Sequence, residues 1–178
     1  VPDDASDLLG AISANKNVYL THDISFTEPS DDPETPVEKI SWTDKITGYN
    51  AEFNGNGHKI TGVDSSWSGA RNTTAQFGMF GYLGGSAYLH DVSFENVKIS
   101  FTAKSGHAQG GYKVSLIASG IHEDARLENV TVTGTLKSKK STQDVVWIQL
   151  FAISPETPTP NKYETEFGCK FDVTLEEN

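Results

Sequence analysis

The sequence predicts an all-β fold, a parallel β-helix with one short capping helix at its N-terminal end. Short runs rich in valine, isoleucine, phenylalanine and threonine recur from residue 18 onward, separated by glycine, asparagine, aspartate or proline. Two segments recur later in the chain: 78–81 recurs as 115–118, and 87–94 recurs as 125–132, after nearly the same number of residues. Such a repeat length is typical of solenoids built from stacked units. Helical spacing of apolar residues occurs only near the N-terminus.

A single domain, residues 1–178, accounts for the chain, because domains usually contain roughly 100 to 200 residues. The composition, 36% hydrophobic and 21% charged, is that of a folded protein. The formal net charge of −10 repels phosphate backbones, so nucleic acid is not an expected partner. No run approaches the roughly 20 apolar residues that cross a bilayer, which predicts no transmembrane segment. Because the chain begins with Val1, we expect it to be part of a larger multidomain protein.

The first expected element is a helix over residues 3–16. Leu8, Leu9 and Ile12 have helical spacing there, and either Ser6 or Asp7 is placed to cap the first turn. In a β-helix this segment would cover the open end of the first coil, where an exposed strand edge would otherwise pair with other chains.

Two proline-rich segments interrupt the strand pattern, at residues 27–38 and 154–162. Each combines prolines with acidic or polar residues and few apolar ones, a composition typical of exposed loops. Because the same strand-like pattern resumes after each segment, we interpret both as loop insertions into one architecture.

The repeat consists of two pieces, a motif of two apolar residues between two small ones and an alternating strand. Gly78-Met-Phe-Gly81 returns as Ser115-Leu-Ile-Ala118, and the segment 87–94 returns as 125–132. Asparagine or aspartate precedes a valine in both strands, which predicts tight corners in a left-handed backbone conformation. The alignment pairs Ala87 with Ala125, Leu89 with Leu127, Asp91 with Asn129, Val92 with Val130 and Phe94 with Val132.

The later part of the repeat pattern is more degenerate. A third copy would begin at residues 149–152 and continue, after the second insertion, in a strand over 169–175. A competing register matches the Glu-Asn-Val tripeptide at 95–97 with the same tripeptide at 128–130. In either register, stacked copies of such a unit would bury one continuous core.

Several of these residues resemble the GLUG-type repeats of bacterial surface proteins. The likeness extends from about residue 18 to 136 and rests on the string Phe53-Asn-Gly-Asn-Gly-His-Lys-Ile-Thr-Gly-Val63, the motif at 78–81 and the alternating strand after Gly84-Gly-Ser-Ala87. The later copies depart from it, because other residues replace the flanking glycines: Ser115, Ala118, Gln149 and Ala152. Such repeats occur in adhesin-like proteins and beside the catalytic part of some bacterial immunoglobulin A peptidases. The resemblance implies a right-handed parallel β-helix outside the cell.

No metal or cofactor site is predicted. The five histidines lack close ligand spacing, and the glycine-rich run at 53–58 lacks the lysine of a phosphate-binding loop. The acidic run at 31–34 lacks the alternating pattern of a calcium loop. Cys169, the only cysteine, stands among apolar residues and is expected to be a buried, inert thiol.

No catalytic residues are predicted, although one acid/base cluster is conceivable. His90-Asp91 and His122-Glu-Asp124 fall at similar places in two repeats and would form such a cluster if they stacked on one face. The match of Asp91 with Asn129 instead favours a structural turn, because asparagine does not share an ionised role with aspartate.

Aromatic residues in small, polar contexts are the candidate ligand-binding residues. Trp67, within Asp64-Ser-Ser-Trp-Ser-Gly69, and Tyr112, after Gln109-Gly-Gly, are expected in exposed loops. Aromatic faces there could stack on sugars or on partner side chains. Trp42 and Trp147 lie in apolar runs and are expected to pack in the core.

The leading hypothesis is a non-enzymatic extracellular or cell-surface module for adhesion, for binding a glycan or a host or cell-surface protein, or for spacing. Its expected contact regions are residues 27–38, 64–76 and 103–113. The rival hypothesis is a carbohydrate-active β-helix enzyme, such as a polysaccharide lyase or glycoside hydrolase, that depends on Asp91 or Asp124. A third hypothesis is a purely structural fragment of a larger protease or adhesin.

Overall fold

The computed structural model describes residues 1–27, 39–69, 76–103, 112–139, 146–148 and 166–177, and over these ranges the protein is all-β apart from one helix, as predicted. No helix among the described residues is both long and apolar enough to cross a membrane. The elements in chain order are α1 (Ala5–Ser13), β1 (Val18–Tyr19), β2 (Ile24–Ser25), β3 (Gly48–Tyr49), β4 (Glu52–Asn54), β5 (Lys59–Thr61), β6 (Asp64–Gly69), β7 (Gln76–Phe77), β8 (Tyr82–Leu83), β9 (Tyr88–Ala103), β10 (Tyr112–Val114), β11 (Gly120–Ile121), β12 (Arg126–Lys139), β13 (Val146–Ile148) and β14 (Lys170–Glu177).

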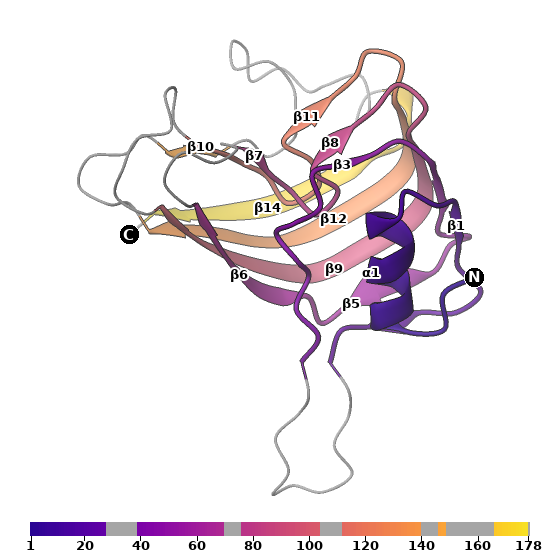
Figure 1. Ribbon diagram of the computed structural model, residues 1–178, viewed down its shortest axis with the longest axis horizontal. Coiled ribbons are helices and arrows are strands. Elements are labelled where there is room, and N and C mark those ends of the chain that lie inside the picture. The colour runs from indigo at the N-terminus through magenta and orange to yellow at the C-terminus, as the bar shows by residue number, and fades with distance from the viewer. Residues whose placement is uncertain (28–38, 70–75, 104–111, 140–145, 149–165, 178) are drawn as a thin grey trace, which may run out of the picture.

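These strands form three parallel sheets. The largest has eight strands, ordered β1-β4-β9-β12-β14, with β2, β5 and β6 beside the longer ones. Two three-stranded sheets, β7-β10-β13 and β3-β8-β11, complete the set. Figure 1 shows the long curved strands of the large sheet facing the two small sheets. The space between the three sheets therefore holds the core.

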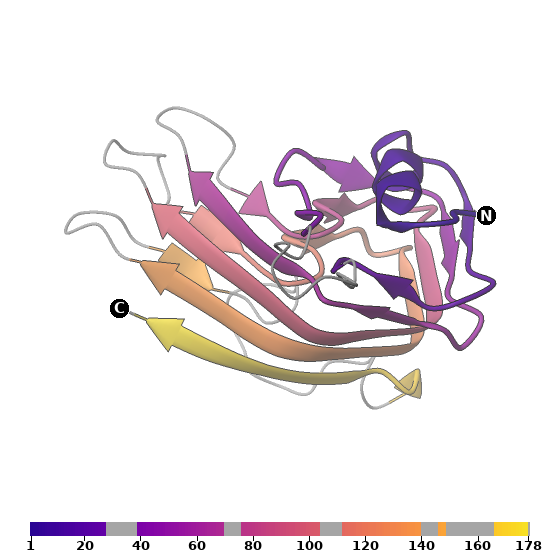
Figure 2. The same cartoon turned by 90° about the horizontal axis from the view of Figure 1, so that it is seen from below.

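Successive strands of each sheet come from successive passages of the chain. Val18 pairs with Phe53, for example, and Tyr112 pairs with Val146. We call each passage a tier: β1 and β2 form the first tier, β3 to β7 the second, β8 to β10 the third and β11 to β13 the fourth, while β14 begins a fifth. Figure 2 shows β6, β9, β12 and β14 side by side in this order.

The predicted register between the third and fourth tiers is confirmed. Leu89 pairs with Leu127, Val92 with Val130 and Phe94 with Val132. The motif at 78–81 lies beside 115–118, because the Met79 and Phe80 amides donate to the Leu116 and Ile117 carbonyls at 3.0 and 2.8 Å. The competing alignment of 95–97 with 128–130 is wrong. Strand β14 confirms the expected strand at 169–175, whereas residues 149–152 lie outside the described part of the chain.

One irregularity changes the spacing of the repeats within a single strand pair. Between the pairs Phe94–Val132 and Val97–Gly134, strand β9 has one more residue than β12. Asn96 takes up this extra residue with a φ of 55°, and its amide donates to Thr133 Oγ1 at 3.0 Å. A Cβ at Gly134 would lie 2.1 Å from the Val97 carbonyl oxygen, so glycine is needed at that position.

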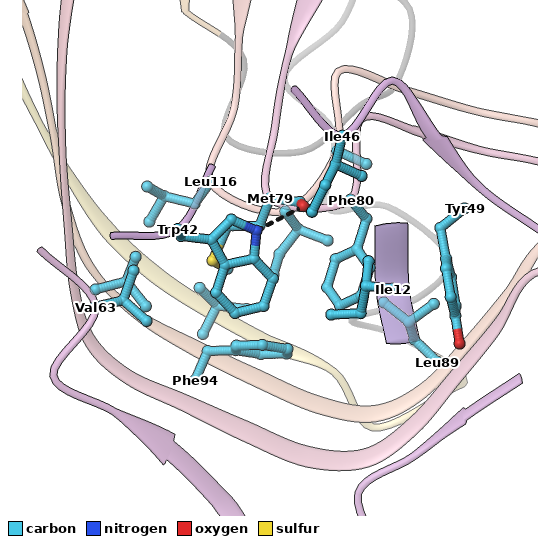
Figure 3. Close-up of a cluster of buried hydrophobic side chains, with 14 of the residues drawn as sticks. Ile12, Trp42, Ile46, Tyr49, Val63, Met79, Phe80, Leu89, Phe94 and Leu116 are labelled. Atoms are coloured by element: carbon cyan, nitrogen blue, oxygen red, sulfur yellow. Dashed lines mark hydrogen bonds between the residues drawn. The ribbon is translucent and has the colours of Figure 1, made fainter. Parts of the chain in front are cut away.

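Large aromatic side chains fill the interior of the stack. Trp42 stacks on Phe26 with ring centroids 5.1 Å apart, and Phe80 lies edge-on to Phe53 and Phe94 at 5.5 and 5.9 Å. All five side chains are fully buried, which confirms the expectation for Trp42. In Figure 3, Trp42 Nε1 donates to the Met79 carbonyl at 2.7 Å. The indole thus satisfies its one polar group inside an apolar core.

Helix α1 lies at the N-terminal end of the stack (Figure 1). Its buried residues Ala5, Leu8 and Ile12 share one face and join the core. The predicted bounds of 3–16 were too wide, and the predicted caps Ser6 and Asp7 were wrong. Asp4 is the N-cap, because its side chain accepts the Asp7 amide at 2.8 Å.

The structure describes only part of the expected insertions and contact loops. Thr27 and Lys39 form an isolated antiparallel bridge that closes the first insertion. Residues 28–38, 70–75, 104–111 and 154–162 lie outside the described residues, as does the side chain of Trp147. Residues 64–69, expected in a contact loop, instead form strand β6, because their alternating burial matches the pleat of the neighbouring β9.

Candidate functional site

The structure buries both aromatic residues that the sequence placed in exposed loops. Trp67 lies in β6 opposite Phe101, is 2% exposed, and donates through Nε1 to the Trp42 carbonyl at 2.9 Å. Tyr112 lies in β10, is 1% exposed, and packs against Phe101 with ring centroids 5.4 Å apart. The predicted exposure is therefore wrong, because the strand pleat turns both side chains inward. These residues offer no face to a ligand.

A column of left-handed residues marks one corner of the stack. Gly57, Asp91, Asn129 and Gly168 occupy it in four successive tiers, with φ values of 80°, 53°, 52° and 70°. Asn129 Nδ2 donates to Asp91 Oδ1 at 2.9 Å, which links the third tier to the fourth. Glycine, asparagine and aspartate tolerate this conformation best. The predicted corner role of Asp91 and Asn129 is confirmed, and we call this column the left-handed corner.

Beside this corner, the structure brings together a group of polar side chains from three tiers. We call it the His90 cluster; it consists of Glu52 on β4, Tyr88, His90 and Asp91 on β9, and Arg126 and Glu128 on β12. His90 lies at its centre, 8% exposed. Its Nδ1 is 2.8 Å from Asp91 Oδ2, and its Nε2 is 3.1 Å from Glu52 Oε1.

Tyr88 forms the outer half of the His90 cluster. Its ring stacks on His90 with centroids 4.2 Å apart and planes inclined by 17°. The Arg126 guanidinium carbon lies 4.3 Å from the centroid of the same ring, an arrangement that attracts a cation to the ring face. The Tyr88 hydroxyl donates to Glu128 Oε2 at 2.7 Å. Each ionisable group in the cluster is therefore placed against another.

These contacts shift two pKa values. The hydrogen bond from His90, then that from Asn129, lowers the pKa of Asp91 below its usual value of 3.8. The hydrogen bond to Glu128, followed by desolvation, raises the pKa of Tyr88 above its usual value of 10.0. Asp91 is thus held as a carboxylate and Tyr88 as a phenol. Neither shift brings the pKa of its group closer to neutral pH, where a general acid or base works best.

The geometry of the His90 cluster suits positioning more than proton transfer. Both ring nitrogens of His90 face carboxylates, and both oxygens of Asp91 are hydrogen-bonded. A neutral imidazole can donate to only one of two carboxylates, whereas a doubly protonated ring can donate to both. With its nitrogens engaged and Tyr88 stacked on one ring face, His90 presents no vacant nitrogen to a substrate.

The second expected acid/base group does not join the first. Register pairs His90 with Glu128, whereas His122 follows a strand that pairs with β8, and its amide donates to the Leu83 carbonyl at 2.8 Å. Asp124 lies in a turn with its side chain 74% exposed. The equivalence of the two histidine motifs was wrong, because they stand at different corners of the repeat.

Four residues of the His90 cluster, Glu52, Tyr88, Arg126 and Glu128, were not predicted to join it, although the repeat contained the signal for the last three. Tyr88 pairs with Arg126 and His90 with Glu128 across the sheet, at the same interval that separates the repeated leucines and valines of these strands. Glu52 pairs with Tyr88 at a shorter interval. No glycine or motif marks that register.

An exposed aromatic ring lies on a different sheet. Tyr82, 40% exposed, is flanked in sheet order by Gly48 and Gly120. Its ring lies over Gly120, where a Cβ would come within 2.7 Å of Tyr82 Cδ2. We call this arrangement the Tyr82 platform. Because both neighbouring residues in the sheet are glycines, no side chain flanks the ring in its sheet row. The partly exposed, flat ring is suited to stacking contacts.

The described residues contain no group of three or more histidine, cysteine, aspartate or glutamate side chains that could hold a metal ion. The acidic run at 31–34, considered for calcium, lies outside the described residues. Cys169 is buried, as expected. No family model, curated protein or solved structure matches this chain.

Proposed function

We propose that the chain is a right-handed parallel β-helix that serves as a non-enzymatic module on the cell surface or outside the cell. Parallel pairing between successive passages of the chain supports the coil architecture, as does the left-handed corner repeated through four tiers. Connections between parallel strands are almost always right-handed. The resemblance to GLUG-type repeats supports the location outside the cell.

The observation that carries the non-enzymatic part of this proposal is the saturation of the His90 cluster. Its central groups, His90 and Asp91, hydrogen-bond to their own neighbours at every ring nitrogen and carboxylate oxygen. A catalytic acid or base needs a site within hydrogen-bond reach of its substrate. The cluster instead ties the second, third and fourth tiers together.

The binding surface of the module is the Tyr82 platform, and its ligand is a glycan or a cell-surface protein. Aromatic rings supply large contact areas with few rotatable bonds, and Tyr82 presents its ring without neighbouring side chains in its own sheet row. The acidic chain, with a net charge of −10, favours neutral or cationic ligands over polyanions.

Glycan arrays and cell-surface protein arrays test this proposal. Tyr82→Ala should weaken binding roughly three- to tenfold, the loss expected for one aromatic stacking contact. Tyr19→Ala is the matched control, because Tyr19 is 45% exposed on β1, in another sheet. Equal binding by both variants and the parent chain would remove the platform from the proposal.

A polysaccharide panel tests the non-enzymatic character separately. We expect no release of reducing or unsaturated ends from any member of the panel. Cleavage that Asp91→Asn abolishes, while the folded state persists by circular dichroism, would replace the binding module with a carbohydrate-active enzyme.

A further inference from the structure

Side chains link three tiers of the stack at His90. From the third tier, His90 Nε2 lies 3.1 Å from Glu52 Oε1 on β4 of the second tier. Its Nδ1 lies 2.8 Å from Asp91 Oδ2, and Asp91 Oδ1 accepts the amide of Asn129, in the fourth tier, at 2.9 Å. The imidazole therefore lies in the middle of a polar chain that runs from the second tier to the fourth.

Carboxylates face both ring nitrogens of His90, Glu52 from β4 and Asp91 from β9. Only a doubly protonated imidazole can donate to both at once, because the neutral ring has one N–H and one lone pair. The Tyr88 ring, stacked on His90 with centroids 4.2 Å apart, can also attract the charged imidazole to its face. How many of these contacts form together therefore depends on a single proton.

Strand β12 adds one charge of each sign near His90. Glu128 is paired with His90 in the sheet, and its Oε2 accepts the Tyr88 hydroxyl at 2.7 Å. The Arg126 guanidinium carbon lies 4.3 Å from the centroid of the Tyr88 ring. Both side chains of β12 thus contact Tyr88, whereas the two carboxylates on the ring nitrogens contact the imidazole directly. Those two carboxylates are the groups that respond first to the proton.

The structure holds these two carboxylates unequally. The contact to Asp91 is the shorter one, and Asp91 is also anchored by Asn129. The Glu52 side chain is 49% exposed, and within the described ranges its carboxylate has no hydrogen bond or ion pair except that with His90. In a neutral ring, a proton on Nδ1 keeps the shorter contact, and the lone pair on Nε2 then faces the negative Glu52 oxygen. This repulsion would turn the exposed Glu52 side chain toward water.

We propose that His90 is a proton-dependent junction between tiers: its doubly protonated form ties the second tier to the third through Glu52, and loss of one proton releases Glu52. The contact between His90 and Asp91 persists in both forms, so the third and fourth tiers stay linked. This regulation goes beyond the binding role proposed above and does not depend on the ligand.

The pH dependence of this junction is opposite in direction to that of the carboxylates. Histidine is the side chain whose ordinary pKa, about 6.5, lies nearest to neutral pH. The contact with Glu52 should be complete below the titration of His90 and lost as pH rises through it. The pKa of Asp91, lowered chiefly by the hydrogen bond from His90 and then by that from Asn129, adds stability that is instead lost in acid. The junction should therefore be strongest in a mildly acidic window between the two titrations.

Double-mutant cycles of urea unfolding at two pH values test the junction. The cycle of His90→Gln with Glu52→Gln should show a coupling of roughly two- to tenfold in the unfolding equilibrium constant at about pH 5.5, and almost none at about pH 8.5. The cycle of His90→Gln with Asp91→Asn should show coupling at both. Lys59→Gln with Glu95→Gln is the matched control, because this 2.9 Å ion pair also joins the second tier to the third. Lysine and glutamate both stay charged over this range, so their coupling should not change.

An NMR titration of the parent chain measures the same proton without any substitution, which keeps the proposal testable if a variant fails to fold. The ring nitrogen shifts of His90 should report a doubly protonated imidazole at the lower pH and the Nδ1–H tautomer at the higher pH. The carboxyl carbon signal of Glu52 should move over the same range. A coupling between His90 and Glu52 that is equal at the two pH values, a neutral ring with its proton on Nε2, or a ring with one constant charge state would each overturn the proposal.

Discussion

The two ends of the stack differ in what closes the core. At the N-terminal end, Leu8 and Ile12 of α1 are completely buried. At the C-terminal end, Leu175 of β14 points along an inner row and remains 41% exposed. A helix covers apolar surface while satisfying its own backbone hydrogen bonds, whereas β14 leaves part of the Leu175 side chain exposed. Among the described residues, the helix therefore buries its apolar side chains more completely than β14 does.

The largest expected difference between the ends is in the cost of removing a leucine. Leu8→Ala should lower the free energy of unfolding by about 2 to 5 kcal/mol, because it leaves a cavity in a fully buried site. Leu175→Ala should cost less than about 1 kcal/mol, the range of exposed substitutions. Urea denaturation of the two variants and the parent chain measures both costs. Similar costs would show that the two ends are closed equally well.

Gly57 and Gly168, the first and last residues of the left-handed corner, should also differ in the stability cost of an alanine substitution. We expect this difference to be smaller than that between the two leucines. A Cβ at Gly57 meets no atom within 4 Å, whereas one at Gly168 lies 2.6 Å from Asn129 Oδ1. Gly57→Ala should cost about 1 to 2 kcal/mol from the positive φ alone. Gly168→Ala should cost more, because it also pushes the Asn129 amide that donates to Asp91. Thermal unfolding of the two variants compares them; a costlier Gly57→Ala would contradict this ranking.

The smallest expected effect is a loss of folding stability at low pH. Two described carboxyl groups have lowered pKa values: Asp23 in the first tier, chiefly through the Lys59 amide, and Asp91 in the third, chiefly through His90. A lowered pKa in the folded state adds stability above the usual value of 3.8, and that stability is lost as pH falls through the folded value. Acid should therefore destabilise the first and third tiers, which contain these two carboxylates.

Asp91→Asn isolates this contribution. The variant should lose less stability than the parent chain when pH is lowered from neutral to about 3, by less than about 1 kcal/mol because Asp91 is partly exposed. Asp124→Asn, a change at a side chain that is 74% exposed, serves as the control. Urea midpoints across this pH range give the comparison. An acid sensitivity that Asp91→Asn leaves unchanged would separate the His90 cluster from the pH response.

The sequence by itself determined the all-β class, the N-terminal helix and the register between the third and fourth tiers. It did so because these features are encoded locally: the apolar alternation of 87–94 recurs at 125–132, and Asp91 and Asn129 stand where a left-handed corner is needed. Residues with strong conformational preferences favour a particular backbone geometry whatever their distant partners are, so this geometry can be predicted from the sequence.

The tertiary structure alone decided the burial of Trp67 and Tyr112 and the composition of the His90 cluster. Small polar neighbours suggested that Trp67 was exposed, yet Ser66 and Ser68 point outward while Ser65 and Trp67 point inward. Which face of a strand is buried depends on the tier against which it pairs, and the length of chain between paired residues differs between β6, β4 and β12 in their pairing with β9. Because this length varies from strand to strand, only the folded stack fixes which side chains meet.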